Sequence, residues 1–168
     1  MLLPKFIATA ILASTTAFSA FAADCYNNKT RGKGVKVNAG KLLMTFQNRA
    51  NDGLTIYVKA RDHENARIWL APSAKVTHVV DLKRSNDCKE SETEETCSRF
   101  VHNEIELGYD PSNSGVEAEL LHFRISNKNN NGYKDTRYNP HSKKLDNVSC
   151  KLTWRPNLQR WDLDMKFK

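Results

Sequence analysis

The chain has 168 residues, with 26 Lys and Arg against 19 Asp and Glu, which gives a formal charge of +7 at pH 7. This length suits one globular domain with its own core and is short for two. Beyond the first 23 residues, no segment approaches the roughly 20 consecutive apolar residues of a membrane-spanning helix, so no transmembrane segment is expected.

The sequence begins with the pattern of a secretory signal peptide over residues 1–23. A basic start is followed by an apolar stretch, and Ala20-Phe21-Ala22-Ala23 supplies small residues for cleavage. We expect cleavage near Ala22 or Ala23, which leaves a single mainly β domain of residues 24–168 with a charge of +6. An alanine-rich leader of this kind is typical of bacterial exported proteins, so a periplasmic or secreted location is predicted.

Four cysteines follow the leader, and an even number in an exported chain predicts two disulfides. Four cysteines allow three pairings, among which the sequence does not choose. We favour Cys25 with Cys150, which ties the start of the mature chain to a late strand, and Cys88 with Cys97, which closes a short polar loop. The chain contains no Cys-x-x-Cys pair, so neither a structural metal nor another cofactor is predicted.

Apolar residues alternate with polar ones along most of the mature chain, as in half-buried β-strands. In chain order, the predicted strands cover residues 42–46, 54–60, 66–70, 75–82, 99–109, 116–126, 150–155 and 161–167. Short strands at this spacing predict a mainly β fold, a single-domain antiparallel β-sandwich or barrel linked by disulfides. At most one short helix is expected, over Ser114–Arg124, where Val116, Leu120 and Phe123 also fit a helical spacing.

Turn residues separate the first two strands and the last two strands. Asn51-Asp52-Gly53 follows the first strand. Pairing of the last two strands would place Trp154 opposite Trp161 on the inner face. The same register sets Lys151 opposite Asp164 on the outer face, and both pairs are favourable cross-strand contacts.

An acidic segment around Cys88 and Cys97 is the most unusual feature of the composition. Residues 86–97 carry a net charge of −4. A disulfide at the base of this loop would lower the entropy that the loop loses on binding. We predict that its tip contacts a basic surface of a partner through four side chains: Glu90, Glu92, Glu94 and Glu95. The alternative is a solvated turn whose charge keeps a sheet edge soluble.

Residues 127–144 form a second charged segment, predicted as a long basic surface loop, and residues 28–36 form a shorter basic segment. The longer segment carries charges, donors and two tyrosines that could contact a protein, an anionic glycan or an anionic surface. Its candidate contact residues are Lys128, Tyr133, Lys134, Arg137 and Tyr138. The alternative is a surface loop without a partner. A nucleic-acid partner is not expected, because the sequence contains no recognition helix, RNA-binding aromatic strand or zinc ligand set.

Histidines and charged residues alternate on two of the predicted strands. His102 shares a strand face with Glu104 and Glu106, and His122 shares one with Arg124. If these strands are neighbours, a histidine, a carboxylate and a cation converge, which suits hydrolysis of phosphodiester or glycosidic bonds. The alternative is a polar strand face that carries these residues because it meets water. The sequence contains no nucleophile elbow, phosphate loop or zinc-protease motif.

Three functions follow as hypotheses. The first is an exported, non-enzymatic binding protein that contacts another macromolecule through charged loops, such as an inhibitor or an immunity protein that neutralises a secreted toxin or enzyme. The second is a secreted hydrolase or nuclease that uses His102 with nearby carboxylates. The third is a secreted effector or adhesin that binds anionic surfaces through residues 127–144. We favour the first, because it needs a rigid exported scaffold and no reacting group.

Overall fold

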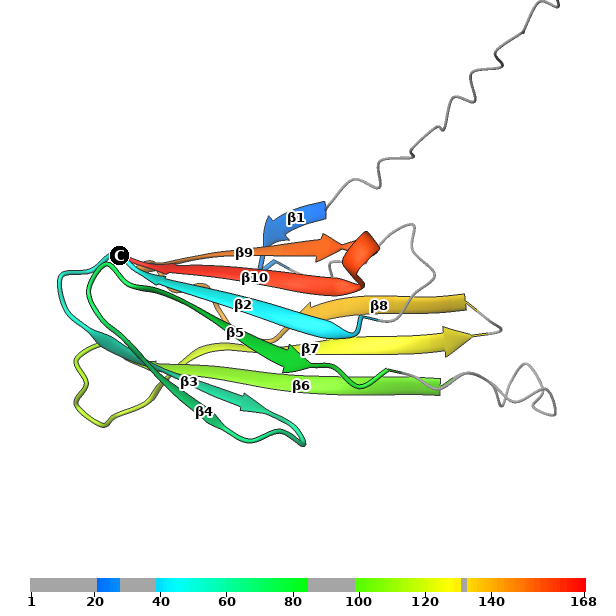
Figure 1. Cartoon of the computed structure of the whole chain (residues 1–168), viewed down its shortest axis with the longest axis horizontal. Helices are drawn as coiled ribbons and strands as arrows, with labels where there is room; N and C mark the ends of the chain where they lie inside the picture. Colours follow the sequence, from blue (N-terminus) through cyan, green and yellow to red (C-terminus); the bar gives the residue numbers. More distant parts are fainter. Residues whose placement is uncertain (1–20, 28–38, 85–98, 131–132) are drawn as a thin grey trace, which may run out of the picture.

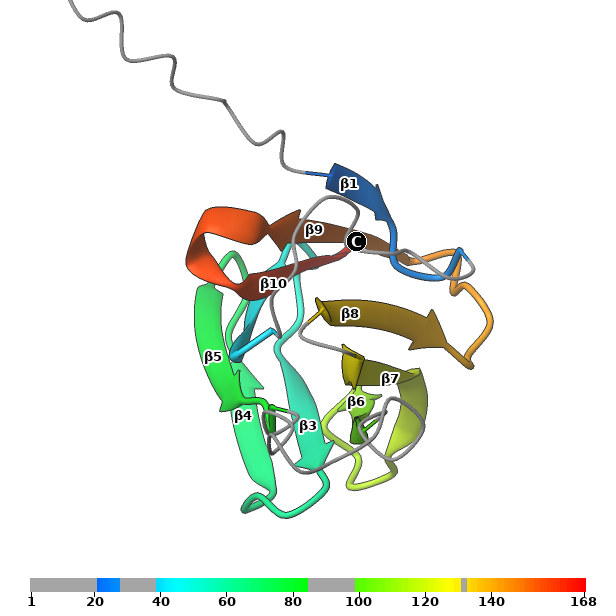
Figure 2. The same cartoon turned by 90° about the vertical axis from the view of Figure 1, so that its right-hand side faces the viewer.

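The computed structural model describes residues 21–27, 39–84, 99–130 and 133–168, which form ten β-strands in two five-stranded sheets (Figure 1). Sheet I contains, in spatial order, β1 (Phe21–Asp24), β9 (Val148–Arg155), β10 (Arg160–Phe167), β2 (Lys41–Asn48) and β5 (Lys75–Asp81). Sheet II contains β4 (Ala66–Leu70), β3 (Leu54–Ala60), β6 (Arg99–Asp110), β7 (Ala118–Asn130) and β8 (Tyr133–Pro140). Figure 2 shows the same strands from one end.

The two sheets confirm the predicted mainly β fold and correspond to its sandwich form. The core lies between the sheets, and its largest buried side chains come from both of them: Trp154, Trp161, Tyr138, Phe46 and Phe123. In the described residues, the only helical segment is the three-residue 3-10 helix η1 (Pro156–Leu158). No helix in those ranges has the length and apolarity that a membrane crossing requires.

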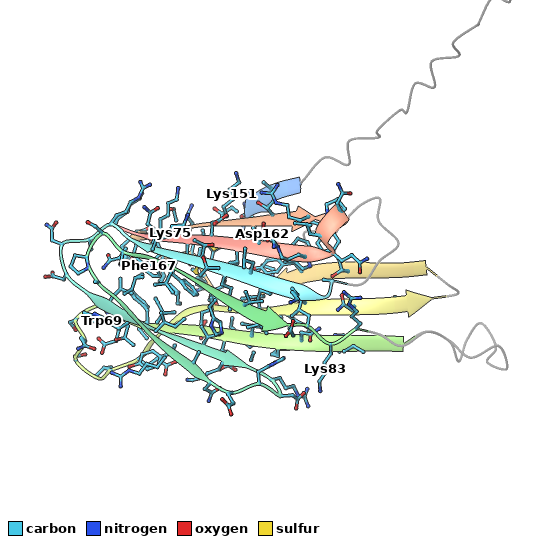
Figure 3. The ribbon with its side chains drawn as sticks, in the orientation of Figure 1. Trp69, Lys75, Lys83, Lys151, Asp162 and Phe167 are labelled. Atoms are coloured by element: carbon cyan, nitrogen blue, oxygen red, sulfur yellow. A yellow bond between two sulfur atoms is a disulfide. The ribbon has the colours of Figure 1, made fainter. Side chains whose placement is uncertain are left out.

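The hairpin of β9 and β10 has the predicted register. Trp154 lies opposite Trp161, and Lys151 lies opposite Asp164. Both indoles are buried, with ring centroids 4.9 Å apart. Lys151 is exposed on the outer side of sheet I (Figure 3). For this hairpin, the alternation of apolar and charged residues is therefore enough to predict both the buried face and the pairing.

The turn at Asn51-Asp52-Gly53 joins strands of different sheets. β2 pairs with β5 and, in parallel, with β10, whereas β3 pairs with β4 and β6. The buried side chain of Asn48 holds this corner, because its amide donates to the carbonyls of Asp52, Leu70 and Ala71 at 2.7, 3.2 and 3.2 Å. The chain therefore passes from sheet I to sheet II at this turn, and the two strands beside the turn do not pair with each other.

The segment Ser114–Arg124, where the sequence left one short helix possible, instead enters strand β7 at Ala118, in agreement with the strand predicted over residues 116–126. A β-bulge explains the misleading spacing. The register of β6 and β7 shifts at the bulge, and Leu120 and Leu121 are both buried as a result. Two adjacent buried leucines interrupt the strand alternation and imitate the spacing of a helix.

The long loop predicted for residues 127–144 is also wrong. Its first residues extend β7, and β8 runs antiparallel beside them. Polar residues on the inner face hid these strands, since Asn127 and Thr136 are both completely buried. Their polar groups have partners inside the sandwich; for example, Trp161 Nε1 donates to Thr136 Oγ1 at 3.2 Å. The segment is therefore mostly a β-hairpin that belongs to sheet II.

The predicted disulfide between Cys25 and Cys150 is present. The two Cα atoms are 5.5 Å apart, and the bond joins residues separated by 125 positions. Beside it, the Tyr138 hydroxyl donates to the Cys25 carbonyl at 2.7 Å, and burial raises the pKa of Tyr138. The predicted bond between Cys88 and Cys97 lies outside the described residues. The start of the domain is thus fixed to both sheets, covalently to β9 and by a hydrogen bond to β8.

Candidate functional site

The first residues of β2, β6 and β8 and the last residues of β5 and β7 lie at one end of the sandwich, at the right of Figure 1. Arg99, which follows the segment with the predicted acidic tip, pairs with Asn129 beside the turn between β7 and β8. Gly40, which follows the basic segment, donates its amide to the carbonyl of Gln159 next to η1 at 2.7 Å. We call this end the loop end and define it by Gly40, Lys83, Arg99, Asn130 and Leu158.

Two buried asparagines of sheet II anchor the chain at the loop end. The Asn127 amide donates to the carbonyls of Ala39 and Lys83 at 2.9 and 2.7 Å. Its oxygen accepts from the Ala39 amide at 3.1 Å. Asn103 accepts from the Lys83 amide at 2.7 Å and donates to the Lys83 carbonyl at 3.1 Å. One flank of the basic segment and one flank of the acidic segment are therefore held against sheet II.

Replacing Asn127 with Ala should lower the free energy of unfolding by about 2–3 kcal/mol, because buried backbone groups then lose their partners. The Ala39 amide loses its acceptor, and the Lys83 carbonyl keeps only Asn103. Urea denaturation followed by circular dichroism measures the loss. The control is Asn157→Ala, at an exposed position of η1, which should change the stability by less than about 0.5 kcal/mol. A similar small change in both variants would contradict the anchoring role of Asn127.

The residues predicted to contact a partner lie in different parts of the molecule. Four of them lie outside the described residues: Glu90, Glu92, Glu94 and Glu95. Tyr133 and Lys134 begin β8 at the loop end. Lys128 is half-buried on β7, and Arg137 is exposed on β8. The backbone therefore brings Lys128, Tyr133 and Lys134 close to the turn between β7 and β8.

Tyr138 is not on the surface, which corrects its prediction as a partner contact. Its side chain is fully buried. Its ring centroid lies 5.1 Å from that of Phe123 and 6.1 Å from that of Trp161. Tyr138 was placed on the surface because the segment around it was expected to be a loop. In the β8 strand it faces inward and fills the space between the sheets.

The outer face of sheet II brings together residues that were predicted to converge. β6 and β7 are antiparallel neighbours, with Glu104 opposite Arg124. His122 Nε2 lies 2.7 Å from Glu104 Oε1, and Arg124 Nε donates to Glu104 Oε2 at 2.8 Å. The predicted meeting of a histidine, a carboxylate and a cation is therefore confirmed. His102 is not the histidine involved, because its Nδ1 lies 2.8 Å from Ser126 Oγ on the same face.

Glu104 is held in its charged form by its neighbours. Burial acts to raise its pKa, but hydrogen bonds from Arg124 and His122 outweigh burial and hold the pKa below the ordinary value. Because an ionised carboxylate only accepts hydrogen bonds, His122 Nε2 carries a proton in this contact and Nδ1 is the basic nitrogen. A histidine oriented in this way has the equipment of a general base.

A second histidine, His141, lies beside the cluster of Glu104, His122 and Arg124. It was not predicted from the sequence. His141 Nε2 lies 3.9 Å from Glu104 Oε1, and its ring centroid lies 5.1 Å from that of His122. The His141 backbone amide donates to the His122 carbonyl at 2.8 Å, which fixes their relative position. Polar residues alternate at Arg137, Asn139 and His141. This alternation would have placed His141 on the outer face if the segment had been treated as a strand.

Two open hollows flank Lys59 and Glu106, which lie opposite each other on β3 and β6. The first, of about 410 Å³, is lined by Lys59, Ala60, Arg61, Asn65, Glu104 and Glu106. The second, of about 430 Å³, is lined by Lys59, Glu106, Leu107, Glu117, Glu119 and His122. Small-molecule sites are usually enclosed and mostly apolar. These open, charged hollows are better suited to contact with the polar surface of a macromolecule.

Over the ranges that the structure describes, no three or more His, Cys, Asp or Glu side chains are grouped so as to hold a metal ion.

Comparison of the sequence with models of protein families gives no match, and comparison with curated proteins gives none either. The loop end and the outer face of sheet II are therefore the two candidate sites of this chain.

Proposed function

We propose that the chain is an exported, non-enzymatic protein that binds another protein through its loop end. The observation that supports this most is the pair of hydrogen bonds from the Asn127 amide to Ala39 and Lys83, which hold one flank of a basic and one flank of an acidic segment. A segment whose flank is already fixed loses less conformational entropy when it binds. Charges of both signs can meet complementary charges on one partner, which favours fast and specific association.

Export is supported by the sequence and by the disulfide. The chain begins with a secretory pattern, and the bond between Cys25 and Cys150 persists in an oxidising compartment such as a periplasm or the cell exterior. In that setting, we propose an inhibitor or an immunity protein that neutralises a secreted toxin or enzyme. This role requires a rigid scaffold and complementary charge. A disulfide-linked sandwich that holds the flanks of two charged segments at Ala39 and Lys83 fits both requirements.

Reversing charges of the acidic segment should weaken binding of the partner. Residues 24–168 of the oxidised protein, which lack the first three residues of β1, are immobilised and exposed to the exported proteins of the cells that make it. We expect Glu92→Lys/Glu94→Lys to bind the principal partner at least about tenfold more weakly than the wild type, because each reversal replaces attraction with like-charge repulsion. The measurement is the dissociation constant of the partner identified by capture on the wild type.

The matched control is Asp52→Lys/Asp146→Lys, which changes the net charge equally at exposed positions away from the loop end. Its dissociation constant should equal that of the wild type. Equal weakening in both double variants would indicate a general effect of charge. Wild-type affinity in the glutamate variant would contradict the assignment of binding to the acidic segment.

A further inference from the structure

Strand β5 is the last strand of sheet I on one side, and its outer edge is open. Among the described residues, β5 pairs with β2 on one side and with no strand on the other. Figure 2 shows β5 at the left margin of the molecule. An open edge presents unpaired backbone N–H and C=O groups, which can pair with a strand of another chain. The edge of β5 is therefore a surface on which an extended strand can dock.

Hydrogen bonds at the two ends of β5 show which of its backbone groups face the open edge. The Ala74 carbonyl accepts from the Asn48 amide at 2.9 Å, and the Leu82 amide donates to the Gly40 carbonyl at 3.0 Å. Both bonds continue the ladder between β5 and β2, which has no register shift. Backbone groups alternate in direction along an antiparallel strand. The even-numbered residues of β5 therefore bond to β2, and the odd-numbered residues direct their N–H and C=O groups to the open edge.

The sequence of β5 lacks the features that usually protect an open edge. Short strands, prolines and charged side chains prevent pairing at edges. β1 and β4 have only four and five residues, and β8 carries Lys134 and Arg137 and ends at Pro140. β5 has seven residues, and its five central residues, Val76–Val80, include no proline and no Lys, Arg, Asp or Glu. Four of these five are Val or Thr, which favour strands.

Side chains at this edge are incompletely covered on both faces of sheet I. Val79, on the outer face, is 45% exposed. Val76 and His78 face the core but are only partly buried. Burial lowers the pKa of His78, which favours its neutral form. A strand laid against β5 would cover apolar surface on both faces of the sheet.

We propose that a second copy of this chain docks at this edge, with the two β5 strands antiparallel about a two-fold axis at His78. Because this axis passes through the middle residue, it pairs all seven residues of each strand. Odd-numbered residues then face odd-numbered residues, whose backbone groups point to the open edge, so each such pair can exchange two hydrogen bonds. Lys75 of each copy lies opposite Asp81 of the other, with valine and threonine side chains opposite each other between them.

Charge complementarity is the reason for choosing a second copy as the occupant. Lys75 and Asp81 are exposed on the outer face at opposite ends of β5, so the strand complements itself when it is reversed. Opposite charges placed directly across two strands stabilise their pairing. The exposed Lys41 lies 3.6 Å from Asp81 on the side of β2, whereas the second copy approaches from the open side. The ion pair between the copies occurs twice, once at each end of the paired strands.

This inference goes beyond the proposed function, because it concerns the edge of sheet I and a second copy of the chain. Antiparallel pairing directs the loop ends of the two copies in opposite directions. Neither loop end would therefore cover the other, and the dimer would present two binding surfaces for the partner of the loop end.

Sedimentation equilibrium of the oxidised protein measures its mass and the dissociation constant of the dimer. Two paired strands of seven residues form a small interface, so we expect a dissociation constant of about 10–100 µM. Lys75→Asp should weaken the dimer at least about tenfold, because it sets like charges opposite each other at both ends. Lys75→Asp/Asp81→Lys should restore the wild-type constant, because it exchanges the two charges and keeps them paired.

The matched control is Lys166→Asp, which makes the same change of charge at an exposed position of β10, the central strand of sheet I. Its dissociation constant should equal that of the wild type. A further variant, Thr77→Pro, removes an N–H group that faces the open edge and leaves the bonds to β2 in place, so it should be monomeric. Circular dichroism establishes that each variant is folded.

Three results would overturn the proposal. The first is a wild-type protein that stays monomeric up to about 1 mM, well above the expected constant. The second is equal weakening by Lys75→Asp and Lys166→Asp, and the third is a double variant that dimerises no better than Lys75→Asp. None of these results would affect the test of the loop end, which uses a different partner and other residues.

Discussion

Replacing both Cys25 and Cys150 with serine is expected to lower the free energy of unfolding by about 5 kcal/mol, because the cross-link restricts the conformations of the unfolded chain. The bond joins residues 125 positions apart, and restriction of the unfolded chain grows with loop length. The folded state should change little, because the hydrogen bond from Tyr138 uses the backbone carbonyl of residue 25. Urea denaturation followed by circular dichroism measures the difference.

The comparison variant is Cys88→Ser/Cys97→Ser. These cysteines are separated by only nine positions, so the bond predicted between them should contribute about 3 kcal/mol by the same entropic effect. The larger loss should therefore belong to the first double variant. If both variants lost equal stability, or if the first lost less than the second, the long-range bond would not have the stabilising role assigned to it here.

Replacing Trp161 with Ala should have the next largest effect, a loss of about 3–5 kcal/mol, because removal of a buried aromatic ring leaves a cavity. Trp161 lies on β10 of sheet I and contacts residues of sheet II. Its ring packs near Tyr138 and Trp154, and its Nε1 donates to Thr136. The substitution therefore removes apolar contacts between the sheets and also leaves the Thr136 hydroxyl without this donor.

Trp69→Ala is the matched control for the tryptophan variant. Trp69 is 54% exposed on the outer face of sheet II, so its removal should cost less than about 1 kcal/mol. Both variants are compared with the wild type by urea denaturation, with circular dichroism rather than tryptophan fluorescence as the signal. Similar losses in the two variants would contradict the placement of Trp161 at the centre of the core.

Local alternation predicts which face of a strand is buried, but it does not predict which strand lies beside it. The register of β9 and β10 could be obtained from the sequence because a short turn makes the two strands neighbours. The parallel pairing of β2 with β10 could not, since more than 100 residues separate them. For the same reason, the sequence did not show that β2 and β3 belong to different sheets. The turn between them would fit a hairpin equally well.

Buried polar residues account for the largest difference between the predicted and the observed strands. Asn127 and Thr136 face the interior of the sandwich, so the last residues of β7 and the strand β8 lack the apolar stripe that marks a half-buried strand. Their burial is tolerated because each has hydrogen-bond partners inside. Such partners come from distant parts of the chain and cannot be counted from local sequence. The same error hid His141 and placed Tyr138 on the surface.

The cluster on the outer face of sheet II could be predicted in part, because its residues alternate on two strands that turn out to be neighbours. Glu104, His122 and Arg124 were expected to meet if their strands were neighbours, and β6 and β7 are neighbours. His122, and not His102, contacts the carboxylate of Glu104. Glu104 lies two residues from His102 on β6 and diagonally across from His122 on β7, and its carboxylate bonds to His122 and Arg124. Strand register decided between two histidines that the alternation pattern could not distinguish.

The most direct test of the central claim, that the loop end binds another protein, is backbone hydrogen exchange of the oxidised chain with and without its captured partner. We predict slower exchange in the complex for residues 126–138 and for the residues that flank the acidic segment. Exchange at residues 49–53 and 141–147 should be unchanged. Protection confined to those two segments, or to the outer side of sheet I, would contradict the claim.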